Sequence, residues 1–189
     1  MMDRQWTGVV LAGGRSSRMG RDKALLPWNG GTLLEHAVER LRPHAREILV
    51  IGDPALYDVP HALTIPDDTP HQGPLGGLVT ALRHARYVRL LVTGCDMPAV
   101  NDRLLNGLKR ELDLSGMDVV APEHDGLLEP LMAAYHKRCI DPFRKCLEEQ
   151  DLKMANVLRQ VRMKTLPLTP GKDGWPADLF RNLNRPEDL

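Results

Sequence analysis

Apolar runs of strand length recur along the chain, and they are separated by segments whose apolar residues follow helical spacing. The first run, at residues 8–12, is continuously apolar, which is typical of a strand covered on both faces of a sheet. We expect further strands at residues 47–52, 63–66, 89–94, 117–122, 131–135 and 164–168.

The segments between the strands carry helix signals. Thr32 and Glu35 have the spacing of a capping box, and the apolar positions that follow predict a helix to about residue 42. Asn101 is the expected N-cap of a helix that reaches about residue 112. We interpret residues 73–77 as a turn, and the remaining helices are expected at residues 78–84, 140–149 and 152–161.

Strands that alternate with helices at these spacings favour right-handed βαβ crossovers. The sequence has no internal repeat and no low-complexity linker. A chain of 189 residues is long enough to bury one hydrophobic core. The sequence therefore predicts one α/β domain, residues 1–189, with a mostly parallel central sheet.

Composition narrows the class of function. The 25 basic and 25 acidic residues give a formal net charge of zero, so no overall field attracts a nucleic acid. No apolar run approaches the ~18 residues of a membrane span, and the N-terminus lacks the apolar part of a signal peptide. The odd number of cysteines, three, favours reduced thiols. We expect a cytoplasmic protein that binds neither nucleic acid nor a membrane.

The most informative segment is the loop after the first strand. Gly13 and Gly14 allow backbone N–H groups to approach a phosphate chain, and the cations Arg15, Arg18 and Lys23 can neutralise its charge. The spacing matches neither a Walker A loop nor a Rossmann fingerprint, and a glycine turn followed by solvated charges is the alternative. We interpret Lys23, a flexible ammonium, and Arg18, a bidentate phosphate ligand, as candidate catalytic residues.

Other candidates follow three more predicted strands. Ligands of open α/β sheets bind beyond the carboxyl ends of the strands, where Gly52, Asp67 and Asp96 are placed. A lone carboxylate such as Asp96 suits a cation held mainly by substrate phosphates and water, although it could instead cap the turn at Pro98. Asp67 can accept hydrogen bonds from a guanine edge, the adjacent Asp68 is an equal candidate, and an Asx turn is the alternative for either.

Four motifs give the chain a family resemblance. They read L-A-G-G-x-S-x-R-M-G-x-D-K at 11–23, G-P-L-G-G at 73–77, G-C-D-M-P at 94–98 and F-R-N-L-N-R-P-E-D-L at 180–189. In this order they resemble the motifs of the molybdenum cofactor guanylyltransferases of the MobA type, within the LAGG-loop nucleotidyltransferases. The resemblance covers nearly the whole chain and implies a three-layer α/β/α sandwich of the Rossmann-like nucleotidyltransferase type.

The resemblance also implies an activity. It is the transfer of GMP from GTP to the terminal phosphate of molybdopterin, with Mg²⁺ as cofactor and pyrophosphate as the second product. The donor-binding lysine of the family falls on Lys23 and its metal-binding aspartate on Asp96, and Asn182 and Asn184 would bind the acceptor. The positions that would contact the nucleotide also include Leu11, Ala12, Gly13, Gly14, Gly52 and Asp67. Molybdenum cofactor insertion proteins and recipient molybdoenzymes are the implied protein partners.

Two departures leave alternatives open. Gly52 stands where the resembling enzymes often carry Asn, and residues 129–131 read Glu-Pro-Leu where many carry His-Pro-Thr, so the acceptor half matches less well. The alternatives to a molybdopterin guanylyltransferase are a cytidylyltransferase, a transferase for another phosphate acceptor, and a non-catalytic GTP-binding module. The Gly13–Gly14 pair favours GTP, and the intact set of candidate catalytic residues argues against the module. Asn184 could also cap the final turn of the chain.

Overall fold

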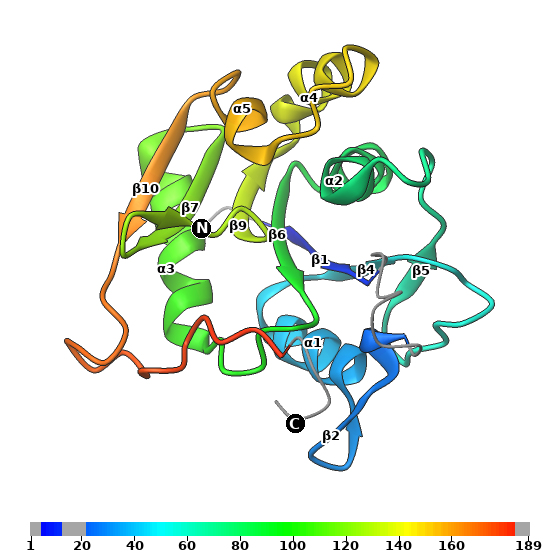
Figure 1. Ribbon diagram of the computed structural model, residues 1–189, viewed down its shortest axis with the longest axis vertical. Coiled ribbons are helices and arrows are strands. Elements are labelled where there is room, and N and C mark those ends of the chain that lie inside the picture. Colours follow the sequence, from blue (N-terminus) through cyan, green and yellow to red (C-terminus); the bar gives the residue numbers. More distant parts are fainter. Residues whose placement is uncertain (1–4, 13–21, 184–189) are drawn as a thin grey trace.

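An eight-stranded sheet forms the centre of the protein in a computed structural model, which describes residues 5–12 and 22–183 (Figure 1). The strand order is β10-β7-β9-β6-β1-β4-β5, and β8 pairs with β7 beside this path. The strands are β1 (Trp6–Leu11), β4 (Glu47–Ile51), β5 (Leu63–Ile65), β6 (Arg89–Gly94), β7 (Val119–His124), β8 (Leu127–Leu128), β9 (Met132–His136) and β10 (Met163–Pro167).

The sheet is mostly parallel, as predicted. Strands β5, β4, β1 and β6 are parallel neighbours, and β10 is parallel to β7, whereas β9 runs antiparallel to both β6 and β7. In the parallel half, Leu11 lies opposite Ile51 on one side and opposite Gly94 on the other. The carboxyl ends of these strands are therefore level with one another at one edge of the sheet.

Helices cover both faces of the sheet. Helices α1 (Leu33–Leu41) and α3 (Asp102–Ser115) lie on one face, and α2 (Gly73–His84), α4 (Ile140–Glu148) and α5 (Met154–Leu158) lie on the other (Figure 1). Successive residues of a strand point to opposite faces, so Val10 of β1 packs with the first helix layer and Val9 with the second. Both valines are completely buried. This arrangement confirms the three-layer α/β/α fold.

The helix caps read from the sequence are present. In α1, the Thr32 hydroxyl accepts from the backbone N–H of Glu35 at 3.2 Å, and the Glu35 carboxylate accepts from the N–H of Thr32 at 2.7 Å. In α3, the Asn101 side chain accepts from the N–H of Leu104 at 3.1 Å. These bonds satisfy amide groups that have no partner within the first turn of a helix.

The start of α2 corrects one prediction. Residues 73–77 form the first turns of this helix and do not precede it. Glycines often mark turns, but here they allow close packing. A methyl group at position 76 would lie 2.9 Å from the carbonyl oxygen of Thr69, and one at position 77 would lie 3.3 Å from a methyl group of Leu11.

Several short elements carry no clear sequence signal. They are the hairpin of β2 (Pro27–Trp28) and β3 (Gly31–Thr32), the strand β8, and the 3₁₀ turns η1 (Lys23–Leu25), η2 (Arg42–His44) and η3 (Lys137–Cys139). Helix α5 is shorter than predicted. The three cysteines are buried and free. In the part of the chain that the structure describes, helices long and apolar enough to cross a membrane are absent.

Candidate active site

Three residues of the candidate site follow strands that end at the same edge of the sheet. Ala12 directly follows β1, Gly52 directly follows β4, and Asp96 is the second residue after β6. Two backbone hydrogen bonds hold this edge together, because the N–H of Ala12 donates to Ile51 at 3.0 Å and that of Gly52 donates to Ile65 at 3.0 Å. Residues far apart in the sequence thus come together at the position where open α/β sheets bind ligands.

Lys23 and Asp96 are in direct contact at this edge. The Nζ atom of Lys23 lies 3.0 Å from Oδ2 of Asp96, and the two side chains are 16% and 31% exposed. Both groups are thus half-buried but open to a ligand. The geometry places one cation and one carboxylate together, which are the groups needed to hold a polyphosphate with its counter-cation.

The backbone around Asp96 positions its carboxylate. A methyl group at position 94 would lie 2.6 Å from Oδ1 of Asp96, so the absence of a side chain at Gly94 makes room for the carboxylate. The carbonyl oxygen of Asp96 accepts a hydrogen bond from the N–H of Leu183 at 2.9 Å. The Leu183 side chain is buried in the same core as Met97.

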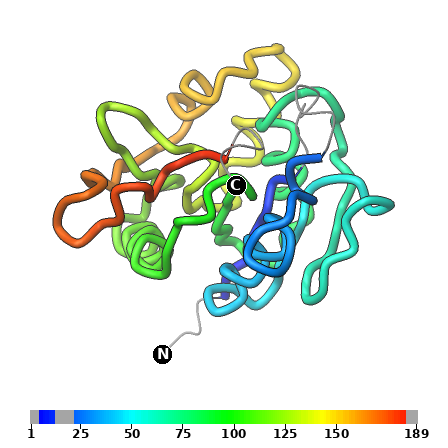
Figure 2. Tube along the Cα trace, turned by 60° about the horizontal axis from the view of Figure 1, so that its bottom comes forward, coloured from blue at the N-terminus to red at the C-terminus, as the bar shows by residue number. Residues whose placement is uncertain are grey.

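The C-terminal segment therefore reaches the candidate site. Residues near 183, at the red end of the described chain, pass beside the end of β6 (Figures 1 and 2). Asn182, a predicted acceptor ligand, is half-buried in this segment, next to the residue that bonds Asp96. The predicted site residues Gly13, Gly14, Arg18 and Asn184 lie outside the described residues.

The turn that carries Lys23 is held by its neighbour. Asp22 caps the 3₁₀ turn η1, and its Oδ1 accepts from the N–H of Ala24 at 3.0 Å. Its Oδ2 accepts a hydrogen bond from the hydroxyl of Tyr57, which also lies 3.3 Å from the carbonyl oxygen of Ala12. Burial, followed by the hydrogen bond to Asp22, raises the pKa of Tyr57, so this hydroxyl keeps its proton at neutral pH.

Tyr57 is a residue that the sequence did not reveal. Its ring lies directly against Gly52, and a methyl group at position 52 would overlap it, 2.7 Å from Cδ2. The signal in the sequence is Gly52 itself, which departs from the Asn that the resemblance leads us to expect at this position. The structure gives this glycine a physical reason, which is the space taken by the Tyr57 ring.

A small pocket beside these residues contains Asp67. It is lined by Gly52, Asp67 and Gly77 together with Leu11, Ile51, Gly73 and Pro74. Oδ1 of Asp67 accepts from the hydroxyl of Thr80 and from the N–H of Thr69, each at 3.0 Å. The other oxygen, Oδ2, would lie 3.2 Å from a methyl group at position 76.

Asp68 is directed elsewhere. Its carboxylate pairs with Arg83 and His84 of α2, each at 3.3 Å. The sequence left Asp67 and Asp68 as equal candidates for a nucleotide contact. In the structure, Asp67 lines the pocket, whereas Asp68 pairs with Arg83 and His84 at the surface.

On the other side of β6, the segment before β9 approaches the same edge. The carbonyl oxygen of Leu131 accepts from the N–H of Gly94 at 3.0 Å. Nearby, Nε2 of His124 lies 3.0 Å from Oε1 of Glu129, and the His124 ring stacks on Phe180 at 4.3 Å between centroids. Glu129 thus contacts His124, whose ring packs on the C-terminal segment at Phe180.

Two observations concern catalysis by a cysteine nucleophile and by a bound metal ion. Burial, with a smaller effect of Asp96, raises the pKa of the Cys95 thiol to about 12. This thiol is protonated at neutral pH and is a poor nucleophile. Among the described residues, no group of three or more His, Cys, Asp or Glu side chains is arranged to hold a metal ion. Any cation at Asp96 would need ligands beyond the His, Cys, Asp and Glu side chains of the described residues.

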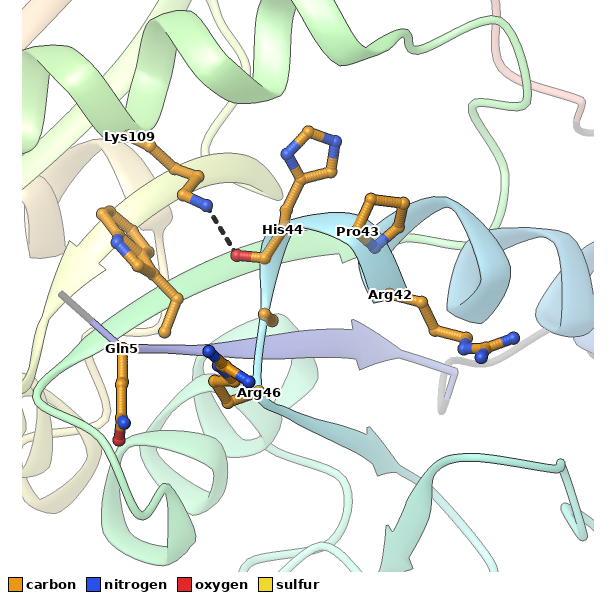
Figure 3. Close-up of a pocket in the computed structure, with 8 residues that line it drawn as sticks. Gln5, Arg42, Pro43, His44, Arg46 and Lys109 are labelled. Carbon is orange, nitrogen blue, oxygen red and sulfur yellow. Dashed lines mark hydrogen bonds between the residues drawn. The ribbon is translucent and has the colours of Figure 1, made fainter. Parts of the chain in front are cut away.

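A larger cavity of about 340 Å³ lies at the opposite edge of the sheet, by the start of β1 and β4 (Figure 3). Lys109 donates to the carbonyl oxygen of His44 at 2.6 Å, and the His44 ring lies 2.8 Å from Asp102. Arg42 pairs with Glu39 at 2.9 Å. These groups tie α1 and η2 to α3, which gives the cluster a structural role.

Comparison with known proteins identifies the family of this chain. The MobA-like NTP transferase domain family matches residues 8–165. A probable molybdenum cofactor guanylyltransferase of Bacillus cereus (strain Q1) is 32% identical over 191 residues, covering 97% of this chain and 94% of that protein. One from Carboxydothermus hydrogenoformans is 33% identical over 183 residues, covering 96% and 92%.

A solved structure is also similar. Molybdopterin-guanine dinucleotide biosynthesis protein A from Archaeoglobus fulgidus has a TM-score of 0.80 and 27% identity, with 96% of this chain and 94% of that chain covered. The family match begins within β1 and ends within β10, and its range includes Lys23, Tyr57, Asp67 and Asp96. The chain is therefore a nucleotidyltransferase that belongs to the MobA-like NTP transferase domain family.

Proposed function

We propose that this protein transfers GMP from GTP to the terminal phosphate of molybdopterin, forming molybdopterin guanine dinucleotide and releasing pyrophosphate. The observation that carries the proposal is the Lys23–Asp96 contact at the carboxyl edge of the sheet, beside the pocket that contains Asp67. The names of the similar proteins support the choice of substrates.

The chemistry requires one displacement at phosphorus. An oxygen of the acceptor phosphate attacks the α-phosphorus of GTP, a new P–O bond forms, and the bond to the β-phosphate oxygen breaks. A phosphate monoester is ionised at neutral pH, so a general base is unnecessary. Catalysis then depends on positioning and on neutralising the charge that moves to pyrophosphate.

Lys23 and Asp96 have complementary tasks in this proposal. The Lys23 ammonium contacts the triphosphate and follows the negative charge toward the leaving group, and Arg18 is proposed as a second phosphate ligand. Asp96 fits a Mg²⁺ site because it offers one accessible carboxylate with room made by Gly94. Bound Mg²⁺ would supply charge neutralisation at the phosphates.

The base would lie toward the pocket. Asp67, whose Oδ1 is already bonded to Thr80 and Thr69, is held rigidly and would accept from the N–H groups of guanine through Oδ2. Gly52 offers only backbone atoms. Leu11, Ala12, Gly13 and Gly14 complete the proposed donor contacts.

The acceptor side is proposed from the C-terminal segment. Asn182 and Asn184 would orient the acceptor phosphate, because the segment is tied to Asp96 through Leu183. The product would be passed to insertion proteins and molybdoenzymes that use a dinucleotide cofactor. These partners are proposed from the family alone.

The test is pyrophosphate release with Mg²⁺, molybdopterin or its molybdenum-loaded form, and GTP, CTP, ATP or UTP in turn. We expect release with GTP and with none of the other three nucleotides. This release should be abolished in Asp96→Asn and kept in the matched variant Asp68→Asn. Release with CTP alone would replace this proposal with a cytidylyltransferase. GTP binding without turnover would favour a non-catalytic module.

A further inference from the structure

Tyr57 connects the wall of the nucleotide pocket to the turn that carries Lys23. Its backbone is fixed at both ends, because its N–H donates to the carbonyl oxygen of Asp53 at 3.0 Å and its carbonyl oxygen accepts from the Thr64 hydroxyl at 2.7 Å. The side chain is 5% exposed. Its hydroxyl is thereby held at one place, where it donates to Asp22.

The contact continues from Asp22 to the reacting groups. One carboxylate oxygen of Asp22 accepts from Tyr57 and the other accepts from the N–H of Ala24, within the turn η1. Lys23 is the first residue of this turn, and its ammonium reaches Asp96 at 3.0 Å. The direction of the Lys23 side chain therefore depends on a carboxylate that Tyr57 holds.

Gly52 and Tyr57 are complementary in shape. A side chain at position 52 would overlap the Tyr57 ring, so the glycine is needed for the ring to reach Asp22. The absence of a side chain at position 52 leaves space next to the pocket wall. Here the aromatic ring fills that space and adds a hydrogen-bond donor next to the Lys23 turn.

We propose that Tyr57 is a positioning residue for nucleotidyl transfer, which orients Lys23 through the hydrogen bond to Asp22. The absence of a side chain at Gly52 provides the space for the Tyr57 ring. The inference rests on the proposed function in one respect, namely that Lys23 contacts the triphosphate. It adds a specific role for a residue outside the motifs of the sequence.

The first test is kinetic. Tyr57→Phe keeps the ring against Gly52 and removes only the hydroxyl, so kcat should fall about tenfold, the effect of one lost hydrogen bond to a charged group, while KM for the acceptor stays constant. The matched control is Tyr135→Phe, which removes a buried hydroxyl that donates to the Pro130 carbonyl oxygen at 2.6 Å. This control should lose stability but keep kcat within about twofold.

A double-mutant cycle separates positioning from general loss of stability. If Tyr57 acts through Asp22, Tyr57→Phe should have no further effect on kcat in an Asp22→Ala background. Additive losses in the double variant would overturn the proposal, because they would mean that Tyr57 acts independently of Asp22.

The second test needs no substrate. The rate at which a water-soluble acetylating reagent labels each lysine is measured by mass spectrometry in the free protein. Lys23 should be labelled several-fold faster in Tyr57→Phe, while Lys137, whose ammonium donates to the Ala85 carbonyl oxygen at 2.6 Å, serves as the unchanged reference. An unchanged rate at Lys23 would overturn the inference. If the wild type transfers no nucleotide, the proposed function fails while this test still decides the role of Tyr57.

Discussion

The ammonium of Lys23 and the carboxylate of Asp96 lie 3.0 Å apart, although 73 positions separate them in the chain. The contact joins the turn after β1 to the end of β6, and β1 and β6 are neighbouring parallel strands. It places a group that can follow phosphate charge next to a group that can hold a cation.

Replacing Lys23 by Met should reduce kcat by about 10²–10³, the usual cost of losing one charged group that stabilises a transition state. The hydrophobic stem of the side chain is kept, so the fold should be retained. Steady-state pyrophosphate release measures the effect. Lys153→Met, at an exposed lysine before α5, is the matched control and should behave as the wild type. Equal rates in all three proteins would remove Lys23 from the mechanism.

Asp67→Asn should weaken GTP binding, because the carboxylate that faces the pocket loses an acceptor oxygen. We expect KM for GTP to rise roughly tenfold, as for one lost hydrogen bond to a charged group, with a smaller change in kcat. Asp68→Asn is the control, since its carboxylate pairs with Arg83 and His84 at the surface. A larger effect from Asp68→Asn would reverse the assignment of these two residues.

Gly94→Ala should impair activity more than it impairs folding. The added methyl group would meet Oδ1 of Asp96 at 2.6 Å and push the carboxylate away from its place beside Lys23. We expect a fall in kcat of at least tenfold, because small displacements of catalytic groups are costly. Gly107→Ala in α3 is the matched control, since its methyl group would make an ordinary contact of 3.5 Å with Leu166. The two variants are compared by thermal melting and by pyrophosphate release, and a Gly94→Ala enzyme with full activity would contradict this reading.

Acid should destabilise the protein through Asp118. Hydrogen bonds from Arg162, followed by the one from Arg138, hold the pKa of this carboxyl well below its usual range. Because the folded-state pKa is lowered, the stabilisation is complete above the unfolded pKa of about 3.9 and is lost as the pH falls further. Asp118→Asn should cost about 1–3 kcal/mol at neutral pH. Denaturant melts at pH 7 and pH 3 should show that this difference shrinks at the lower pH.

Local patterns predicted most of the fold. The apolar runs located every strand of the main sheet except β8, and the caps at Thr32 and Asn101 located the starts of α1 and α3. The predicted start of α2 was wrong, because a glycine pair gives the same sequence pattern in a turn as in a helix that packs closely on Leu11. The antiparallel direction of β9 follows from pairing with β6 and β7, which no local pattern encodes.

The sequence by itself determined the order of strands and helices along the chain, the edge of the sheet at which ligands would bind, and the kinds of charged groups placed there. These features depend on residue type and on short-range spacing. The tertiary structure decided which of Asp67 and Asp68 lines the pocket, why position 52 is a glycine, and that Tyr57 holds Asp22 next to Lys23. The physical reason is that these choices are made by contacts between side chains far apart in the chain, where shape and hydrogen-bond geometry act only after the sheet has formed.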